Sequence, residues 1–146
     1  MENTNISAAP VKKIKLDFKD SKYATGRRKR SIAKVWVKKG SGNIYVNGIK
    51  MNEYFKRPVH QILVARPLEI SECRTNYDIR CSVKGGGLSG QAGAIILGIS
   101  RALIIHDENF KNNLKKDKLT TRDSRVVERK KYGHRKARRS FQFSKR

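Results

Sequence analysis

Residues 75–106 read TNYDIRCSVKGGGLSGQAGAIILGISRALIIH, and this stretch decides how the chain folds. Thr75–Lys84 alternates apolar and polar side chains, the pattern of a half-buried strand. Apolar residues then recur at helical spacing and predict a helix over about 91–106, joined to the strand by the glycine-rich turn Gly85–Gly90. The expected buried faces are Tyr77, Ile79, Cys81 and Val83 on the strand and Ala92, Ile95, Ile96, Ile99 and Leu103 on the helix.

Shorter strands are predicted upstream of this stretch. Residues 32–38 alternate, with Ala33, Val35 and Val37 on the apolar face, and residues 44–46 resume the pattern after Gly40–Gly42, which predicts a hairpin. Asn47-Gly48 is a two-residue turn signal, because a type I′ turn needs positive φ at both central positions. A short third strand is expected over residues 49–51.

A first helix is predicted between these strands and the long one. Val59, Ile62, Leu63 and Ile70 recur at helical spacing; Pro58 suits the first turn, and Pro67 limits the end of the helix. The predicted fold class is α+β: a two-layer, four-stranded sheet with helices on one face, in the order β-β-β-α-β-α, followed by a long, extended basic C-terminal tail.

The composition points to a polyanionic partner. The 146 residues include 35 Lys and Arg against 12 Asp and Glu, a formal net charge of +23. Nucleic acid is the first candidate, ahead of an anionic membrane surface and an acidic protein. The length disfavours two full domains, and no apolar run approaches the ~18 residues of a membrane span. Cys73 and Cys81 form no CxxC and the histidines are scattered, so disulfide scaffolds and zinc modules are disfavoured and a reducing cytosol fits.

The charge divides the chain into three parts. Residues 1–21 are polar with a net charge of +1, and we expect a flexible N-terminal extension. Residues 22–110 carry +10 and are expected to form the globular α+β RNA-binding domain. Residues 111–146 carry +12 and predict a basic C-terminal helix or loop and an extended tail, within which residues 129–146 hold nine cations and no acid.

The glycine-rich turn admits three interpretations. Gly85–Gly90 matches GxGxxG between a strand and a helix, as in a dinucleotide-binding enzyme. That fingerprint also needs a later parallel strand, for which residues 109–118 are too polar, and Gln91 stands where a P-loop needs lysine. A tight strand-to-helix turn is the plain alternative. We favour a third: backbone N–H groups at a helix N-terminus that hold a nucleic-acid phosphate.

Two basic blocks favour contact with nucleic acid. Gly26–Arg30 reads GRRKR, and arginine suits bidentate phosphate binding, although a solvated charge run is the plain alternative. Residues 129–146 interleave cations with Tyr132, Phe141 and Phe143, which can stack on bases while the cations follow phosphates. Asp107 and Glu108 are expected to solvate a helix end, and His60 and His106 lack a nucleophile or carboxylate in sequence register. We therefore expect no enzyme, no cofactor and no metal.

Five stretches carry a family resemblance: Thr25–Ala33, Tyr45–Gly48, Val83–Ile95, Thr121–Lys131 and Gln142–Arg146. In this order and from about Tyr23 to Arg146, the chain resembles the bacterial-type small-subunit ribosomal protein nine family. The resemblance implies a left-handed crossover in the fold and binding to 16S rRNA in the head of the subunit, beside neighbouring head proteins. It also implies that the tail contacts the anticodon stem-loop of the transfer RNA in the peptidyl site, and that the protein works in the cytoplasm, on the ribosome.

The site residues follow from the basic blocks and this resemblance. By position, Lys145 and Arg146 are the expected tRNA-contacting cations, with Ser144 as their neighbour. The expected rRNA-binding residues are Arg27, Arg28, Lys29, Arg30, Lys84, Gly85, Gly86, Gly87, Arg122, Arg125, Arg129, Lys130, Lys131, Arg135, Lys136, Arg138 and Arg139. A free-standing DNA- or RNA-binding module is the first alternative and a dinucleotide-binding enzyme the second. No membrane and no small-molecule substrate are expected as partners.

Overall fold

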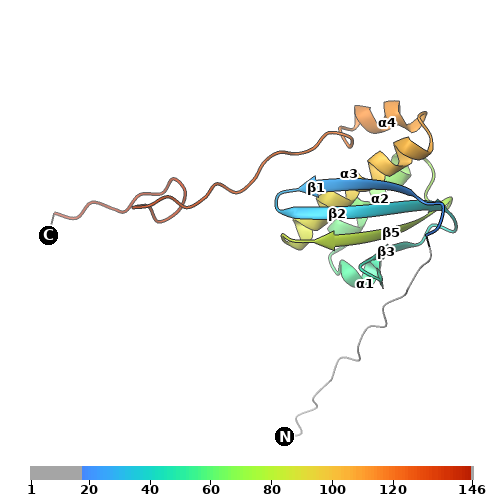
Figure 1. The fold of residues 1–146 in the computed structure, drawn as a ribbon. Coiled ribbons are helices and arrows are strands. Elements are labelled where there is room, and N and C mark those ends of the chain that lie inside the picture. Colours follow the sequence, from blue (N-terminus) through green and yellow to red (C-terminus); the bar gives the residue numbers. More distant parts are fainter. Residues whose placement is uncertain (1–17, 146) are drawn as a thin grey trace, which may run out of the picture.

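The computed structural model describes residues 18–145. It is an α+β fold with a mixed five-stranded sheet in the order β1-β2-β5-β3-β4 (Figure 1). The strands are β1 (Lys22–Arg28), β2 (Ser31–Lys39), β3 (Ile44–Val46), β4 (Ile49–Lys50) and β5 (Tyr77–Lys84). The helices are α1 (Met51–Tyr54), α2 (Pro58–Ile70), α3 (Leu88–His106) and α4 (Phe110–Lys116). Residues 1–17 of the expected N-terminal extension lie outside the described residues.

The predicted four-stranded sheet is wrong by one strand. Lys22–Arg28 forms β1 and pairs with β2 in antiparallel register, so Arg27 and Arg28 lie inside a strand instead of leading into one. The inward positions of β1 include Ala24 and Gly26, whose small side chains do not produce the apolar alternation typical of a half-buried strand. Gly26 must be small, because a Cβ there would overlap the backbone carbonyl of Ala94 on α3.

The predicted hairpin between β2 and β3 is also wrong. β5 lies between them: it pairs antiparallel with β2 and parallel with β3. The connection from β3 to β5 runs through β4, α1 and α2, and its left-handed crossover stays a prediction. The Asn47-Gly48 turn is confirmed, since it joins β3 to β4 with φ of 52° and 85° at the two residues.

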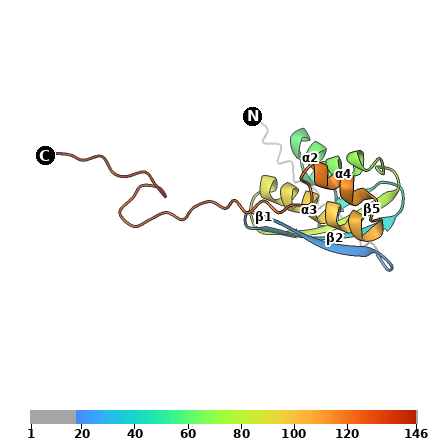
Figure 2. The same ribbon diagram turned by 90° about the horizontal axis from the view of Figure 1, so that it is seen from above.

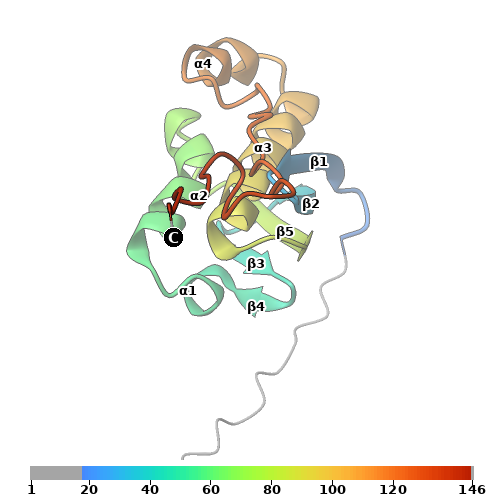
Figure 3. The same cartoon turned by 90° about the vertical axis from the view of Figure 1, so that its left-hand side faces the viewer.

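α2 and α3 cover one face of the sheet, as the sequence predicts (Figure 2; Figure 3). The expected inward faces of β5 and α3 are confirmed except at Ile96, which is only half-buried. α3 begins at Leu88, earlier than expected, because Gly87 already occupies its N-cap position. The buried core includes Val35, Val37, Phe55, Leu68, Ile79, Ile95, Ile99 and Leu103.

The predicted apolar face of α2 is wrong at Val59 and Ile62, whereas Leu63 is half-buried and Ile70 packs against the core. Val59 and Ile62 are 64% and 63% exposed, while His60, Val64 and Leu68 are buried against the rest of the fold. The helix also continues through Pro67 to Ile70. Proline removes a single backbone hydrogen bond, and the Pro67 ring is itself fully buried in compensation.

Two short helices extend the fold beyond the expected elements. α1 begins at Met51, so the third predicted strand ends at Lys50. α4 follows α3 and buries Leu114 completely, and Leu119 packs against the same core. We call residues 22–119 the body and residues 120–145 the C-terminal segment. Between Thr120 and Lys145 the described chain has one isolated β-bridge, His134 to Ser140.

Contrary to the expectation that no apolar run approaches the length of a membrane span, α3 is long and apolar enough to cross a membrane by length and composition alone. In this fold, more than half of its most apolar stretch is buried inside the protein. Its side chains pack against β1, β2 and β5, so its role in the core accounts for its apolar character.

Candidate nucleic-acid interface

The β1–β2 turn and the glycine-rich loop lie against each other at one end of the sheet. Lys29 and Arg30 form the turn, and Lys29 adopts a left-handed φ of 51°. Ser31, directly after the turn, donates its hydroxyl to the carbonyl of Gly85 at 3.0 Å. Gln91 from α3 donates to the same carbonyl at 3.2 Å. Two segments far apart in the sequence are thereby held in one place.

Gly86 and Gly90 of this loop pack closely on Ser31, and Gly85 packs on the backbone carbonyl of Arg30. Gly85 and Gly86 have φ of 74° and 61°, and a Cβ on Gly86 would overlap the Ser31 hydroxyl. A Cβ on Gly90 would lie 2.8 Å from that hydroxyl. Gly87 differs, because no atom lies within 4 Å of the position of its Cβ. Local geometry therefore explains the loop as a tight turn, while Gly87 leaves the backbone open to solvent at the start of α3.

The dinucleotide-binding interpretation is wrong for this fold. It needs a parallel strand directly after the helix, next to the strand that precedes the loop. Within residues 18–145, α3 is followed by α4, and β5 already has β2 and β3 as its neighbours. The loop is the connection of an α+β fold, not of a nucleotide-binding βαβ unit.

Cations surround this end of the sheet. Arg27, Lys29, Arg30 and Lys84 are all exposed, and Lys84 is paired with Ile32 in the strand beside the turn. The first N–H groups of α3 are at the same end, where the helix dipole is positive. Exposed cations next to a helix N-terminus form a surface suited to anions such as phosphate.

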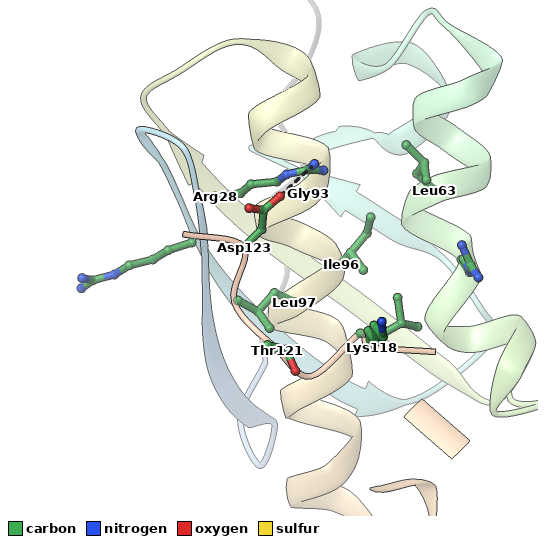
Figure 4. A pocket seen from close by; sticks show the side chains of 11 residues that line it. Arg28, Leu63, Gly93, Ile96, Leu97, Lys118, Thr121 and Asp123 are labelled. Carbon is green, nitrogen blue, oxygen red and sulfur yellow. Dashed lines mark hydrogen bonds and ion pairs between the residues drawn. The ribbon is translucent and has the colours of Figure 1, made fainter. Parts of the chain in front are cut away.

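Arg28 is placed differently from its neighbours. Its guanidinium pairs with Asp123 of the C-terminal segment at 3.4 Å, and its side chain crosses α3 at Gly93, where a Cβ would overlap it (Figure 4). Its Nε is buried and makes no hydrogen bond. The structure thus assigns Arg28 to a contact between the body and the C-terminal segment.

Asp123 lies at the centre of that contact, because it pairs with both Arg28 and Arg125. The sequence did not indicate this role. Asp123 accepts hydrogen bonds from the Arg125 guanidinium at 2.8 Å and from the Arg125 backbone N–H at 3.0 Å. These hydrogen bonds, together with the charges of Arg125 and Arg28, hold the pKa of Asp123 well below its usual range. Asp123 therefore stays charged and anchors the start of the C-terminal segment on β1.

Next to this anchor lies a cavity of about 210 Å³ between α2, α3 and residues 118–123 (Figure 4). Leu63, Ile96 and Leu97 supply apolar walls, and Arg66 and Lys118 line it as well. The segment after α4 thus crosses the helical layer before it reaches Asp123.

Every acid in residues 111–145 is paired with a cation. Besides Asp123, Asp117 pairs with Arg66 at 3.8 Å, and Glu128 pairs with Lys131 and Arg138, both at 3.0 Å. Hydrogen bonds from Lys131 and Arg138 lower the pKa of Glu128. The remaining residues of this segment that are predicted to contact RNA, and that the structure describes, are exposed: Arg122, Arg129, Lys130, Arg135, Lys136, Arg139, Ser144 and Lys145. Arg146 lies outside the described residues.

The aromatic side chains of the C-terminal segment are also available to a partner. Tyr132 is fully exposed and Phe143 is 84% exposed. The Arg135 guanidinium lies 5.3 Å from the centre of the Phe141 ring. Exposed rings between cations are the groups that stack on unpaired bases.

His60 and His106 have partners that the sequence did not indicate. His60 Nε2 lies 3.1 Å from the Ser89 hydroxyl and ties α2 to α3, while its buried Nδ1 makes no hydrogen bond. His106 Nδ1 lies 3.2 Å from Asp107, which also accepts a hydrogen bond from Tyr77 at 3.0 Å. Asp107 thus has a structural partner in addition to its place at the helix end. Burial, followed by the contact with Asp107, raises the pKa of Tyr77 to about 12.

Neither histidine pair assembles a recognisable catalytic centre. A nucleophilic serine needs a base that is itself oriented by a third group, and His60 Nδ1 has none. Within the described part of the chain, no three His, Cys, Asp or Glu side chains come together as a metal site.

One comparison with known protein families relates this geometry to function. A family profile described as ribosomal protein S9/S16 matches residues 26–146. The match covers the β1–β2 turn, the glycine-rich loop, Asp123 and the entire C-terminal segment.

Proposed function

The chain belongs to the ribosomal protein S9/S16 family, whose members are structural proteins of the small ribosomal subunit, and from this premise we propose that its body binds the 16S rRNA of the subunit head. We propose further that its C-terminal end contacts the transfer RNA in the peptidyl site. The family implies ribosomal RNA and other ribosomal proteins as partners. The proposal places the protein beside neighbouring head proteins on cytoplasmic ribosomes.

The observation that carries the rRNA proposal is the end of the sheet where Ser31 joins the turn to the glycine-rich loop. Lys29, Arg30 and Lys84 are held there on hydrogen-bonded backbone, next to the N-terminus of α3. Rigidly placed cations recognise the spacing of phosphates in a folded RNA and not its base sequence. The exposed backbone at Gly87 allows a phosphate to approach the first N–H groups of the helix.

The charge of the C-terminal segment supports the second half of the proposal. Among the described residues, Asp123 and Glu128 already pair with cations, and Arg129, Lys130 and Lys136 add further exposed positive charge. Ser144, Lys145 and Arg146 add two further cations to the segment. Cations at that point would stabilise tRNA where its phosphates lie against those of rRNA.

Binding of the full chain to 16S head-domain RNA, measured over a range of salt concentrations, tests the rRNA contact. We expect Lys29→Gln with Arg30→Gln to weaken binding and to reduce the slope of log affinity against log salt by about one to two. The matched control is Lys111→Gln with Lys115→Gln on the exposed side of α4, which removes the same charge from another surface. An equal loss in both variants would show that only total charge matters and would refute the proposed contact.

A free-standing RNA-binding module would share the same charge pattern. The two functions separate by sedimentation, because a small-subunit protein remains with the subunits at moderate salt. Recovery of most of the protein in the supernatant would favour the free module.

A further inference from the structure

The sheet face turned away from α2 and α3 carries a row of aromatic and cationic side chains. The strand register aligns Tyr23 with Trp36, Trp36 with Arg80, and Arg80 with Tyr45. The row therefore crosses β1, β2, β5 and β3 at one level of the sheet. α2 and α3 lie on the other side of the sheet (Figure 2). We call these four residues the aromatic row.

Three members of the row, Tyr23, Trp36 and Arg80, contact one another. The Tyr23 and Trp36 rings have centroids 5.3 Å apart and are tilted by 42°. The Arg80 guanidinium lies 5.5 Å from the centre of the Trp36 ring on the next strand. Tyr23 is 44% exposed, Arg80 is exposed, and Trp36 and Tyr45 are half-buried. The contacts hold the rings in place at the surface while leaving part of them open to a ligand.

Cations surround the row on the same face. The alternation of each strand and the register place Arg27, Lys34, Lys38, Lys50 and Lys84 there, and all five are exposed. The acid on this face of β5 is Asp78, which accepts hydrogen bonds from the backbone N–H groups of Ser41 and Asn43 at 3.0 and 2.9 Å. Asp78 is thus occupied in holding the β2–β3 loop. The face is strongly cationic with an aromatic centre.

This combination selects one class of partner. An acidic peptide would match the cations but offers few flat groups for the rings, and an RNA duplex keeps the faces of its bases stacked inside the helix. Unpaired RNA nucleotides carry phosphates for the lysines and base faces for stacking on aromatic side chains and arginine. A β-sheet that presents aromatic side chains is a known platform for such bases.

We propose that the aromatic row is a stacking site for unpaired nucleotides of ribosomal RNA. The inference rests on the proposed rRNA binding and names a second contact for it, on the open face of the sheet, which Arg27 and Lys84 connect to the β1–β2 turn and the glycine-rich loop. Stacking on Tyr23, Trp36 and Arg80 would orient the body on its RNA, because it requires an unpaired base at a defined distance from the phosphates bound by the turn.

Trp36 makes the site directly observable, because it is the only tryptophan in the chain. The full-length protein is titrated with an unstructured single-stranded RNA and, separately, with an RNA hairpin duplex of equal charge, while tryptophan fluorescence is recorded. We expect saturable quenching by the single strand and little by the duplex. Equal responses to both would overturn the proposal, since charge alone would then explain the binding.

Substitutions at Tyr23 separate stacking from packing. Tyr23→Leu keeps apolar contact with Trp36 but removes the ring, and should weaken single-strand binding about tenfold. Tyr23→Phe keeps the ring and should bind within about twofold of the original chain. Ile62→Ala removes an exposed apolar side chain from α2, on the other side of the sheet, and should leave both single-strand binding and the Trp36 signal unchanged. Melting temperatures of all variants confirm that each is folded.

The assembled ribosome distinguishes RNA from protein as the occupant. Tyr23→p-benzoylphenylalanine places a photo-crosslinker in the row, and small subunits containing it are irradiated. An adduct with 16S rRNA is the expected result. An adduct with a neighbouring protein, or none, would overturn the inference. If Tyr23→Leu binds head-domain RNA as tightly as the original chain, stacking fails while the proposed function stands. If the original chain does not bind that RNA, the proposed function itself fails.

Discussion

The body and the C-terminal segment are both strongly basic but hold their charge in different ways. In the body, cations such as Lys29, Arg30 and Lys84 stand on strands and turns whose positions are fixed by backbone pairing and by the Ser31–Gly85 hydrogen bond. In the C-terminal segment, cations line an exposed chain with one isolated β-bridge. A rigid surface can match the shape of a folded RNA, whereas a chain with little structure of its own gains its order from the partner.

The two regions meet at Arg28, Asp123 and Arg125. This junction fixes where the segment leaves the body, close to the β1–β2 turn that we propose binds rRNA. A partner RNA bound at the turn would therefore lie near the start of the basic segment. We therefore expect substitutions in the core of the body to lower the free energy of unfolding, and removal of the C-terminal segment to weaken RNA binding. Substitutions at the junction should lower the free energy of unfolding only slightly.

The largest effect on folding is expected at Gly26. Gly26→Ala forces a Cβ into the backbone of α3 at Ala94 and should lower the free energy of unfolding by about 3 kcal/mol. Urea denaturation measures the change. Gly87→Ala is the matched control, because no atom lies within 4 Å of the added Cβ, and its stability should remain within about 0.5 kcal/mol of the original. Equal losses in both variants would contradict the described packing of β1 on α3.

Removal of residues 129–146 should leave the stability of the protein nearly unchanged but weaken its binding to RNA. The truncation deletes nine cations but no buried residue of the core, so we expect the unfolding free energy to change by less than about 0.5 kcal/mol. Affinity for 16S rRNA at about 0.1 M salt should fall at least about tenfold, with a shallower salt dependence. Filter binding across a salt series measures both quantities. A large loss of stability would show that the segment is part of the folded unit.

A pH-dependent effect on stability is expected at Tyr77, the first residue of β5. Tyr77→Phe removes the hydrogen bond to Asp107 and should cost about 1 kcal/mol at neutral pH. The Tyr77 pKa is raised from 10.0 to about 12, so the unfolded chain loses this proton first as pH rises. The stabilisation is complete below pH 10 and is lost between pH 10 and 12, at up to about 1.4 kcal/mol per pH unit.

Denaturation curves from neutral to alkaline pH test this expectation. The phenylalanine variant should show a weaker decline above pH 10 than the original chain. Parallel curves for the two proteins would contradict the proposed role of Tyr77.

The smallest effect is expected at the junction. Asp123→Asn weakens the pairing with Arg28 and Arg125, but ion pairs that remain partly open to solvent contribute little to stability. Because the pKa of Asp123 is lowered in the folded state, its contribution is present above the ordinary carboxyl pKa and is lost as pH falls below it. Unfolding midpoints of the variant and the original chain should therefore differ slightly at neutral pH and converge in acid. A gap that persists in acid would assign the effect to packing instead of charge.

The sequence predicted elements whose signals are local. β5 and α3 combine long apolar patterns with a glycine-rich turn, and Asn47-Gly48 has the chemistry of its turn type. The sequence did not predict β1, since Ala24 and Gly26 face inward without large apolar side chains. It also misjudged α2, where His60 is buried and Val59 and Ile62 are exposed, because burial there depends on where α3 and Phe55 lie.

The sequence indicated candidate contact residues, but it did not predict how these residues lie relative to one another. Basic runs are visible in the sequence, whereas the insertion of β5 between β2 and β3 is a long-range pairing with no local signal. That pairing brings Arg80 beside Trp36 and Tyr45, and brings Gly85 to Ser31. Asp123 was overlooked because its partner Arg28 is remote in sequence and was interpreted only as a cation for RNA.

We propose that the body binds rRNA and that the C-terminal end contacts tRNA. The most direct test of this proposal is the dissociation rate of peptidyl-site tRNA from reconstituted small subunits. One set of subunits carries the full chain and the other a chain that lacks Ser144–Arg146. We predict equal incorporation of both chains, because the body is intact, and faster tRNA dissociation from subunits with the shortened chain. Unchanged tRNA dissociation at full incorporation would contradict the account.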